Sequence, residues 1–263
     1  MPSVVDFVGT AAPLTQAGFD AVSSRLGVDA PSLWSLVTVE TRGFGFLADR
    51  RPKILFERHV FHRRTGGRFS AAHPDISNHT AGGYSRDTAG EYLRLERASA
   101  LDHQAAIEST SWGLGQVMGF NAVSLGYPSA AEMIVAFMQG EDAQLEGSER
   151  FIAGNVSLAK AFRMRDWGRV ARFYNGIGYA KNQYDKKLAR CHNTYSTKGT
   201  PSIELRAAQA RLTYLGFDPG AVDGLIGRAT RAALTAFQTA NALPATGTPD
   251  VRTLDALRTA AGV

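Results

Sequence analysis

The sequence predicts a mainly α-helical protein with two domains: an α+β domain with a small β-sheet, then a small three-helix domain. Apolar residues recur at helical spacing in several segments. Residues 52–61 are instead rich in β-branched and aromatic side chains and alternate like a strand. Residues 193–202 are polar, contain Gly199 and Pro201, and lack periodicity. We therefore expect a first domain over 1–195, a linker over 196–202 and a second domain over 203–263.

The composition excludes several classes of protein. Of 263 residues, 44% are hydrophobic and 20% are charged, which is typical of a folded chain rather than a disordered one. The single cysteine, Cys191, excludes an intrachain disulfide and a cysteine-rich zinc module. No apolar run approaches the roughly 18 residues of a membrane helix. The first residues contain Asp6 and lack a basic start, so we expect no signal peptide.

The net charge of +5 is too small to indicate nucleic-acid binding, but its distribution is uneven. Residues 151–200 carry ten Lys and Arg against two acidic residues, Asp166 and Asp185. This excess is consistent either with solvated helix faces or with a surface that contacts a polyanion.

The first informative helix is predicted over residues 29–43. Asp29 can cap its start, and Gly43 can end it. Its apolar stripe consists of Leu33, Leu36 and Val37. Glu40 follows Leu33 by seven residues and therefore falls on the same face. Burial and the negative end of the helix dipole both raise a carboxyl pKa, as a general acid at neutral pH requires. In the alternative interpretation, Glu40 turns outward into solvent.

A second carboxylate follows in the predicted strand over residues 52–61. Alternation places Leu55, Glu57, His59 and Phe61 on one face. Glu57 lies 17 residues after Glu40, and a pair of carboxyl groups is suited to glycoside hydrolysis. Glu57 is alternatively explained by an ion pair with one of the neighbouring arginines, Arg42, Arg50 or Arg51.

Two later segments are candidates for ligand contacts. In Ser111–Met118, Gly113 and Gly115 permit close backbone approach, and the Gln116 side chain both donates and accepts hydrogen bonds. Residues 166–176 are predicted to form a helix with Trp167, Val170 and Tyr174 on one face. Tyr174 is suited to line a sugar site. For Trp167 and Phe173 we expect core packing.

The C-terminal unit is predicted to contain three short helices. The apolar face of the first consists of Leu205, Ala208, Leu212 and Leu215. The second is expected from near Gly227 through Gln238. The third opens at residues 248–250 and turns Leu254 and Leu257 inward.

This unit resembles the peptidoglycan-binding type 1 module. The matching residues are Gln209–Leu212, Leu215–Phe217, Pro219–Gly220, Val222–Gly224, Gly227, Thr230, Ala233 and Phe237–Gln238. The resemblance implies attachment to the bacterial cell wall.

The first domain resembles the lysozyme-like muramidase and lytic transglycosylase superfamily, and more narrowly the N-acetylmuramidase endolysins of phages that infect Gram-negative hosts. The matching segments are Val39–Leu47, Pro52–His62, Pro74–Ile76, Gly82–Tyr84, Ser111–Asn121 and Tyr174–Leu188. The resemblance implies that Glu40 is the general acid. It also implies glycan contacts by Ser111, Gln116, Tyr174 and Asn175. Glu57 is a weaker match, because related transglycosylases use one carboxylate. Tyr174–Gly176 also departs from the Tyr-Asn-Ala-Gly typical of transglycosylases.

Two other chemistries are disfavoured. His59 and His62 would face opposite sides of a strand, and no His-Glu-x-x-His motif indicates a zinc enzyme. Cys191 and His192 are adjacent rather than convergent, and Cys191 is in helical phase with Tyr184 and Leu188, which favours a core thiol.

The sequence thus predicts a monomeric peptidoglycan hydrolase without metal or cofactor that cuts between N-acetylmuramic acid and N-acetylglucosamine. A lytic transglycosylase and a non-catalytic wall-binding phage structural protein are the alternatives. Expected partners are peptidoglycan and anionic outer-membrane components, not nucleic acid. We expect the protein to accumulate in a host cytoplasm and to act on the periplasmic wall, and a secreted bacterial effector fits the same residues.

Overall fold

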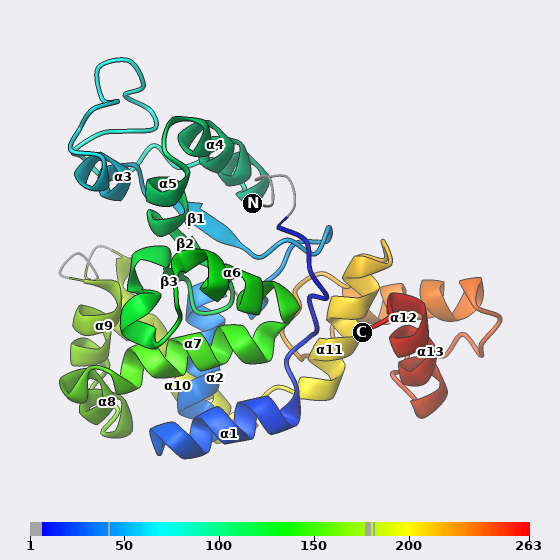
Figure 1. Ribbon diagram of the computed structural model, residues 1–263. Helices are drawn as coiled ribbons and strands as arrows, with labels where there is room; N and C mark the ends of the chain where they lie inside the picture. The colour runs from blue at the N-terminus through cyan, green and yellow to red at the C-terminus, as the bar shows by residue number, and fades with distance from the viewer. Residues whose placement is uncertain (1–6, 42, 177–179, 181) are drawn as a thin grey trace.

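The computed structural model describes residues 7–41, 43–176, 180 and 182–263, with only the backbone of Thr41 and Asn175. It shows a largely helical first domain followed by a smaller helical domain (Figure 1). The first domain has two hydrophobic cores, and each core belongs to one lobe.

The first lobe is entirely helical within the described residues. It consists of α1 (Gln16–Leu26), α2 (Ala30–Thr41), α7 (Glu141–Ala153), α8 (Val156–Arg163), α9 (Trp167–Asn175) and α10 (Tyr184–Lys198). Helix α2 packs along α10, and its predicted stripe of Leu33, Leu36 and Val37 is buried in this core. The predicted cap is confirmed, because the carboxylate of Asp29 accepts a hydrogen bond from the Ser32 backbone N–H at 2.9 Å.

The second lobe contains the small sheet and the remaining helices of the first domain. Its elements are β1 (Ile54–Phe56), α3 (Arg58–Arg64), α4 (Thr88–Leu101), α5 (His103–Glu108), β2 (Thr110–Trp112), β3 (Val117–Met118), the 3₁₀ turns η2 (Gly119–Asn121) and η3 (Val123–Leu125), and α6 (Ala130–Gln139). The three strands are antiparallel in the order β1-β2-β3, with Ile54 opposite Trp112 and Ser111 opposite Met118.

The strand predicted over residues 52–61 is wrong beyond Phe56. Glu57 is the N-cap of α3, so His59, Phe61 and Glu57 do not share a strand face. The helix buries Val60 and Phe61, and the Phe61 ring packs at a tilt against Phe56 in the second core. A short apolar run is compatible with either period, and tertiary packing selected the helix.

The predicted helix over residues 166–176 is confirmed as α9. The Asp166 carboxylate caps it by accepting from the Arg169 N–H at 3.1 Å. Val170 is buried, and Trp167 and Tyr174 pack against the first core. Core packing of Phe173 was a wrong expectation, because its side chain is 39% exposed. The face of α9 that meets the core consists of Trp167, Val170, Ala171 and Tyr174, and Phe173 lies outside it.

The second domain has the three predicted helices: α11 (Ile203–Tyr214), α12 (Arg228–Ala240) and α13 (Val251–Ala261). Their core includes Leu212, Leu234, Phe237 and Leu257. Residues 196–198, which the sequence assigned to a linker, form the last turn of α10, so only residues 199–202 connect α10 to α11.

The second domain is docked against the first. Arg206 of α11 and Glu141 of α7 form a fully buried ion pair at 2.6 Å. A small apolar cluster also spans the two domains, with Phe44 and Phe46 from the first and Ala210 and Val222 from the second. Figure 1 shows α11 beside the N-terminal segment that precedes α1, and the Tyr214 hydroxyl donates to Ala11 O there at 2.8 Å. None of the described helices is both long and apolar enough to span a bilayer.

Candidate active site

A cleft of about 590 Å³ lies where the two lobes meet. It is lined by Glu40, Leu55, Glu57, His59, Val60, Arg63, Ser111, Gln116, Met118, Phe120, Tyr174 and Gly176. Segments distant in sequence therefore meet here: the end of α2, the β1–α3 junction, the β2–β3 hairpin and the end of α9. Five of the six predicted site residues line this one cleft. The side chain of the sixth, Asn175, lies outside the part of the chain that the structure describes.

Glu40 lies in the last turn of α2 and is half-buried at the cleft wall. Burial raises the pKa of its carboxyl to about 7, against a smaller opposing effect from the Tyr184 hydroxyl, which donates to Oε1. A carboxyl with this pKa carries a proton in a large fraction of molecules at neutral pH. Glu40 is therefore suited to donate a proton to a bound substrate.

Glu57 faces the same cleft from the start of α3. The Tyr84 hydroxyl lies 3.0 and 3.1 Å from its two carboxylate oxygens, and His59 Nδ1 lies 3.0 Å from Oε2. Among the described residues, the group at ion-pair distance from Glu57 is thus His59 rather than Arg50 or Arg51, and Arg42, the third arginine that the sequence suggested, lies outside them. Burial and the Glu57 carboxylate raise the pKa of the Tyr84 hydroxyl to about 12, so this phenol stays protonated and holds Glu57 in place.

Ser111 and Gln116 form one side of the cleft in the β2–β3 hairpin. Ser111 Oγ donates to Gln116 Oε1 at 2.8 Å, and Gln116 Nε2 donates to the carbonyl oxygens of Gly113 and Lys53 at 2.9 and 3.3 Å. These bonds hold Gln116 at a φ of 50°. The Gln116 amide therefore supports the hairpin from within, and both of its polar atoms already have protein partners.

Gly115 is required by packing inside the protein. A Cβ at this position would collide with Ser148 Oγ and would lie 3.2 Å from the Tyr174 hydroxyl oxygen. That hydroxyl donates to Gly115 O at 2.9 Å, and its ring packs edge-on against Phe151. Tyr174 therefore joins α9 to the hairpin while one side of it lines the cleft.

Three site residues were not identified by the sequence. Tyr184 was interpreted as a core residue in phase with Leu188, and it is buried, yet its hydroxyl reaches Glu40. Tyr84 and His59 contact Glu57 from a loop and from α3. A tyrosine that is buried with its hydroxyl inward needs a polar partner, and this was the available signal for Tyr184.

The histidines do not gather around a common point. His62 Nδ1 lies 2.7 Å from Ser70 Oγ, whereas His59 faces Glu57. Within the described ranges, no three side chains of His, Cys, Asp or Glu form a cluster that could hold a metal ion. Cys191 is half-buried in α10, and burial raises the pKa of its thiol.

Comparison with known proteins supports this interpretation of the cleft. Residues 29–196 match the family model of N-acetylmuramidases, and residues 202–257 match a model described as a putative peptidoglycan binding domain. A solved structure of the Burkholderia AP3 phage endolysin is 40% identical, with a TM-score of 0.64 over 70% of this chain and 72% of that chain. No curated protein matches the chain.

The family model covers more than half of the chain, including every residue of the cleft. The second match coincides with α11, α12 and most of α13. The chain therefore belongs to the N-acetylmuramidase family, and it is a peptidoglycan hydrolase with a C-terminal peptidoglycan-binding domain.

Proposed function

We propose that this hydrolase cleaves the β-1,4 bond between N-acetylmuramic acid and N-acetylglucosamine, with Glu40 as the general acid. The main support is the Glu40 carboxyl itself: it stands at the wall of an open cleft with a pKa raised to about 7. Cleavage of a glycosidic bond needs a proton on the leaving oxygen, and a carboxyl of this pKa supplies one near neutral pH.

Glu57 supplies the second carboxyl of the proposed mechanism. As the glycosidic bond breaks, positive charge develops on the sugar ring, and a nearby carboxylate stabilises it or orients the attacking water. The contacts from Tyr84 and His59 restrict the Glu57 side chain and thereby reduce the reorganisation needed during the reaction. A second carboxyl in the cleft favours hydrolysis over the transglycosylase reaction.

The test of Glu40 is its replacement by glutamine, which keeps the shape but cannot donate a proton as an acid. We expect Glu40→Gln to lower the rate of cleavage of purified peptidoglycan by at least about 10³-fold. Sedimentation with insoluble walls should remain unchanged, because α11–α13 lie apart from the cleft. A variant that still lyses walls at the original rate would refute the assignment, whereas loss of both lysis and wall binding would indicate misfolding.

Mass spectrometry of the soluble products tests which glycosidic bond is cleaved and whether cleavage occurs by hydrolysis or by transglycosylation. Hydrolysis at the proposed bond leaves a reducing N-acetylmuramic acid end. A reducing N-acetylglucosamine end would refute the bond assignment, and a 1,6-anhydro end would refute hydrolysis in favour of transglycosylation. The same digestion with Glu57→Gln should be strongly slowed if Glu57 participates in the chemistry.

The second domain completes the proposed function by holding the enzyme on its polymer. A domain bound to the wall keeps the cleft at a high local concentration of glycan strands. Because the buried Arg206–Glu141 pair fixes the two domains together, the orientation of the cleft relative to the bound wall is also restricted.

A further inference from the structure

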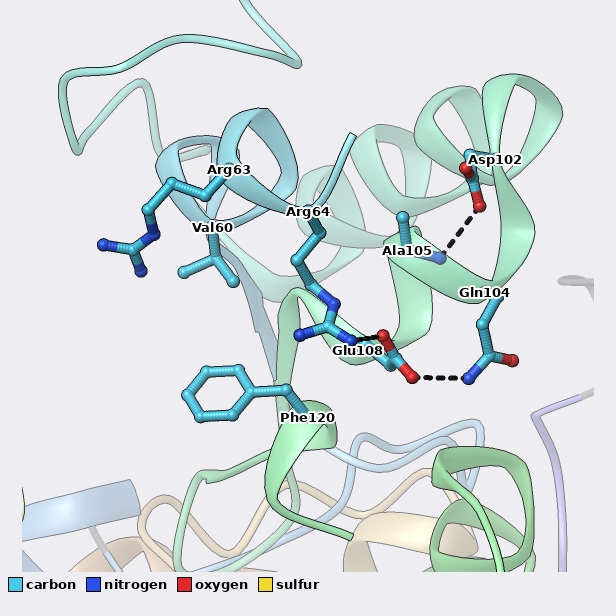
Figure 2. Close-up of a pocket in the computed structure, with 8 residues that line it drawn as sticks. All are labelled: Val60, Arg63, Arg64, Asp102, Gln104, Ala105, Glu108 and Phe120. Carbon is cyan, nitrogen blue, oxygen red and sulfur yellow. Dashed lines mark hydrogen bonds and ion pairs between the residues drawn. The ribbon is translucent and has the colours of Figure 1, made fainter. Parts of the chain in front are cut away.

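A second hollow of about 690 Å³ adjoins the active-site cleft. Figure 2 shows the residues that line it: Val60, Arg63, Arg64, Asp102, Gln104, Ala105, Glu108 and Phe120. Val60, Arg63 and Phe120 line both the hollow and the cleft. A glycan strand in the cleft therefore lies next to the hollow, and a branch on that strand has room to enter it.

The two carboxylates of the hollow are already occupied by protein groups. Glu108 forms an ion pair with Arg64 and accepts from Gln104 Nε2 at 2.6 Å. Asp102 caps α5 by accepting from the Ala105 N–H at 3.0 Å, and on its other oxygen it pairs with Arg68 at 3.0 Å. Neither acid is therefore available to neutralise a further cation.

Arg63 stands on the shared boundary and differs from its neighbour Arg64. Figure 2 shows Arg64 turned to Glu108, whereas the Arg63 side chain extends away from α3. Within the described residues, the Arg63 side chain has no hydrogen-bond or ion-pair partner. Beside it, the Phe120 ring is 42% exposed and presents an apolar face. The boundary thus offers an unneutralised guanidinium next to an aromatic surface.

We propose that Arg63 and Phe120 form a subsite for the carboxylate-bearing peptide that branches from muramic acid, so that the enzyme prefers peptide-substituted strands over bare glycan. This inference rests on the proposed function. In bare strands the lactyl carboxylate of muramic acid is free and lies close to the sugar ring. In peptide-bearing strands that carboxyl is bound as an amide, and the peptide carries its own carboxylates and aliphatic side chains further from the glycan. A guanidinium binds a carboxylate through two parallel hydrogen bonds, and the adjacent ring accommodates the aliphatic part.

The experiment compares two soluble substrates: glycan strands that keep their peptides, and the same strands after an amidase has removed them. For the wild type we expect a kcat/KM about tenfold higher on the peptide-bearing strands. Arg63→Gln should lower that value about tenfold and reduce the value on bare strands by a much smaller factor, so that most of the preference is lost. Arg63→Lys should retain part of the preference. Arg252→Gln is the matched control, since Arg252 is an exposed arginine on α13.

Two results would overturn the subsite. If Arg63→Gln slowed cleavage of both substrates equally, Arg63 would act on the glycan or on the fold, not on the peptide. If the wild type showed no preference, no peptide subsite would exist. Phe120→Ala is expected to weaken the peptide preference, and an equal loss on both strands would assign the ring to the sugars instead.

A binding measurement separates this inference from the proposed function. In a Glu40→Gln background, calorimetry with a disaccharide-peptide and with the peptide-free disaccharide reports the subsite without cleavage. We expect Arg63→Gln to weaken binding of the disaccharide-peptide about tenfold and to weaken binding of the disaccharide by a much smaller factor. If Arg63→Gln weakens binding as expected but the wild-type enzyme cleaves neither substrate at the proposed bond, the subsite is supported and the proposed function is refuted.

Discussion

At the scale of single residues, two effects act on the pKa of the Glu40 carboxyl in opposite directions. Burial of the carboxyl raises the pKa, and the hydrogen bond from Tyr184 lowers it by stabilising the ionised form. Burial is the larger effect, so the pKa remains at about 7. The pKa of the proposed general acid therefore depends on the burial of Glu40 at the end of α2 and on the hydroxyl of Tyr184 on α10.

This balance predicts the pH dependence of cleavage. A general acid acts in its protonated form, which predominates below its pKa. We expect kcat/KM on soluble glycan strands to fall as the pH rises through about 7. The measurement is a pH–rate profile at constant ionic strength. Activity that increases steadily up to pH 9 would contradict the assignment of Glu40 as the acid.

The hydrogen bond from Tyr184 gives a second prediction of defined sign. Tyr184→Phe removes the donor that stabilises ionised Glu40, so the pKa of Glu40 should rise and the alkaline limb of the profile should move to higher pH. Tyr195→Phe is the control, because the Tyr195 hydroxyl pairs with Thr38 at 2.9 Å on the same two helices. An alkaline limb that does not move, or moves down, would show that this bond does not act on Glu40.

At the scale of elements, the β2–β3 hairpin brings the cleft residues of the second lobe against α7 and α9. Gly115 allows this close approach because it has no Cβ to meet Ser148. Leu114 N–H also donates to Gln144 Oε1 of α7 at 2.7 Å. The position of Ser111 and Gln116 therefore depends on contacts between the hairpin and both helices.

We predict that Gly115→Ala lowers kcat at least about tenfold, because the new methyl group must displace Ser148 and the Tyr174 hydroxyl. The rate on soluble strands and the thermal unfolding temperature should both be measured. Gly227→Ala is the matched control, since nothing lies within 4 Å of the Cβ that it adds. Equal activity of the two variants would show that the hairpin tolerates displacement.

The basic segment from α8 to α10 is the subject of a further prediction at this scale, that its surface contacts a polyanion. Lys160 of α8 and Arg172 of α9 are exposed, and the side chains of Met164 and Phe173 near them are 69% and 39% exposed. If this surface contacts an anionic envelope, lysis of whole sacculi should fall as salt rises from about 0.05 to 0.3 M. A Lys160→Gln, Arg172→Gln variant should lose that dependence. The corresponding change of Arg228 and Arg252 in the second domain should not.

At the scale of the whole molecule, the two domains share a buried polar network. Arg206 donates to both Glu141 oxygens at 2.6 and 2.7 Å and to Gly43 O at 2.6 Å. Glu141 also accepts from the backbone N–H groups of Leu14 and Gly45. Gly43 follows Glu40 by three residues, so the second domain holds the segment that follows α2, the helix that carries Glu40.

Removal of one partner from this network should destabilise the protein strongly. We expect Arg206→Met to lower the free energy of unfolding by about 3–5 kcal/mol, because Glu141 would remain buried without a cation. Denaturant unfolding measures this, with exposed Arg252→Met as control. Adding Glu141→Gln to Arg206→Met should recover part of the loss. An Arg206→Met variant as stable as the control would show that the interface opens readily.

Several elements of the fold are predictable from local features of the sequence, and others are not. The helices α2, α9 and α11–α13 follow from apolar spacing and from caps such as Asp29 and Asp166, which act within one turn of chain. The end of strand β1 at Phe56 does not follow from the sequence, because residues 57–61 fit both the two-residue period of a strand and the 3.6-residue period of a helix. The sequence also did not predict that residues 196–198 form the end of α10, because the helix continues there without an apolar stripe.

The family, the two domains and the candidate acid were predictable from the sequence, because motifs and helical phase are local properties of the chain. Three contacts became evident only from the packed structure: Tyr184 reaches Glu40, His59 rather than Arg50 or Arg51 lies at ion-pair distance from Glu57, and Arg206 of the second domain pairs with Glu141 of the first. These contacts link residues from different elements, and their energies depend on burial and distance. Those quantities exist only after the lobes have packed.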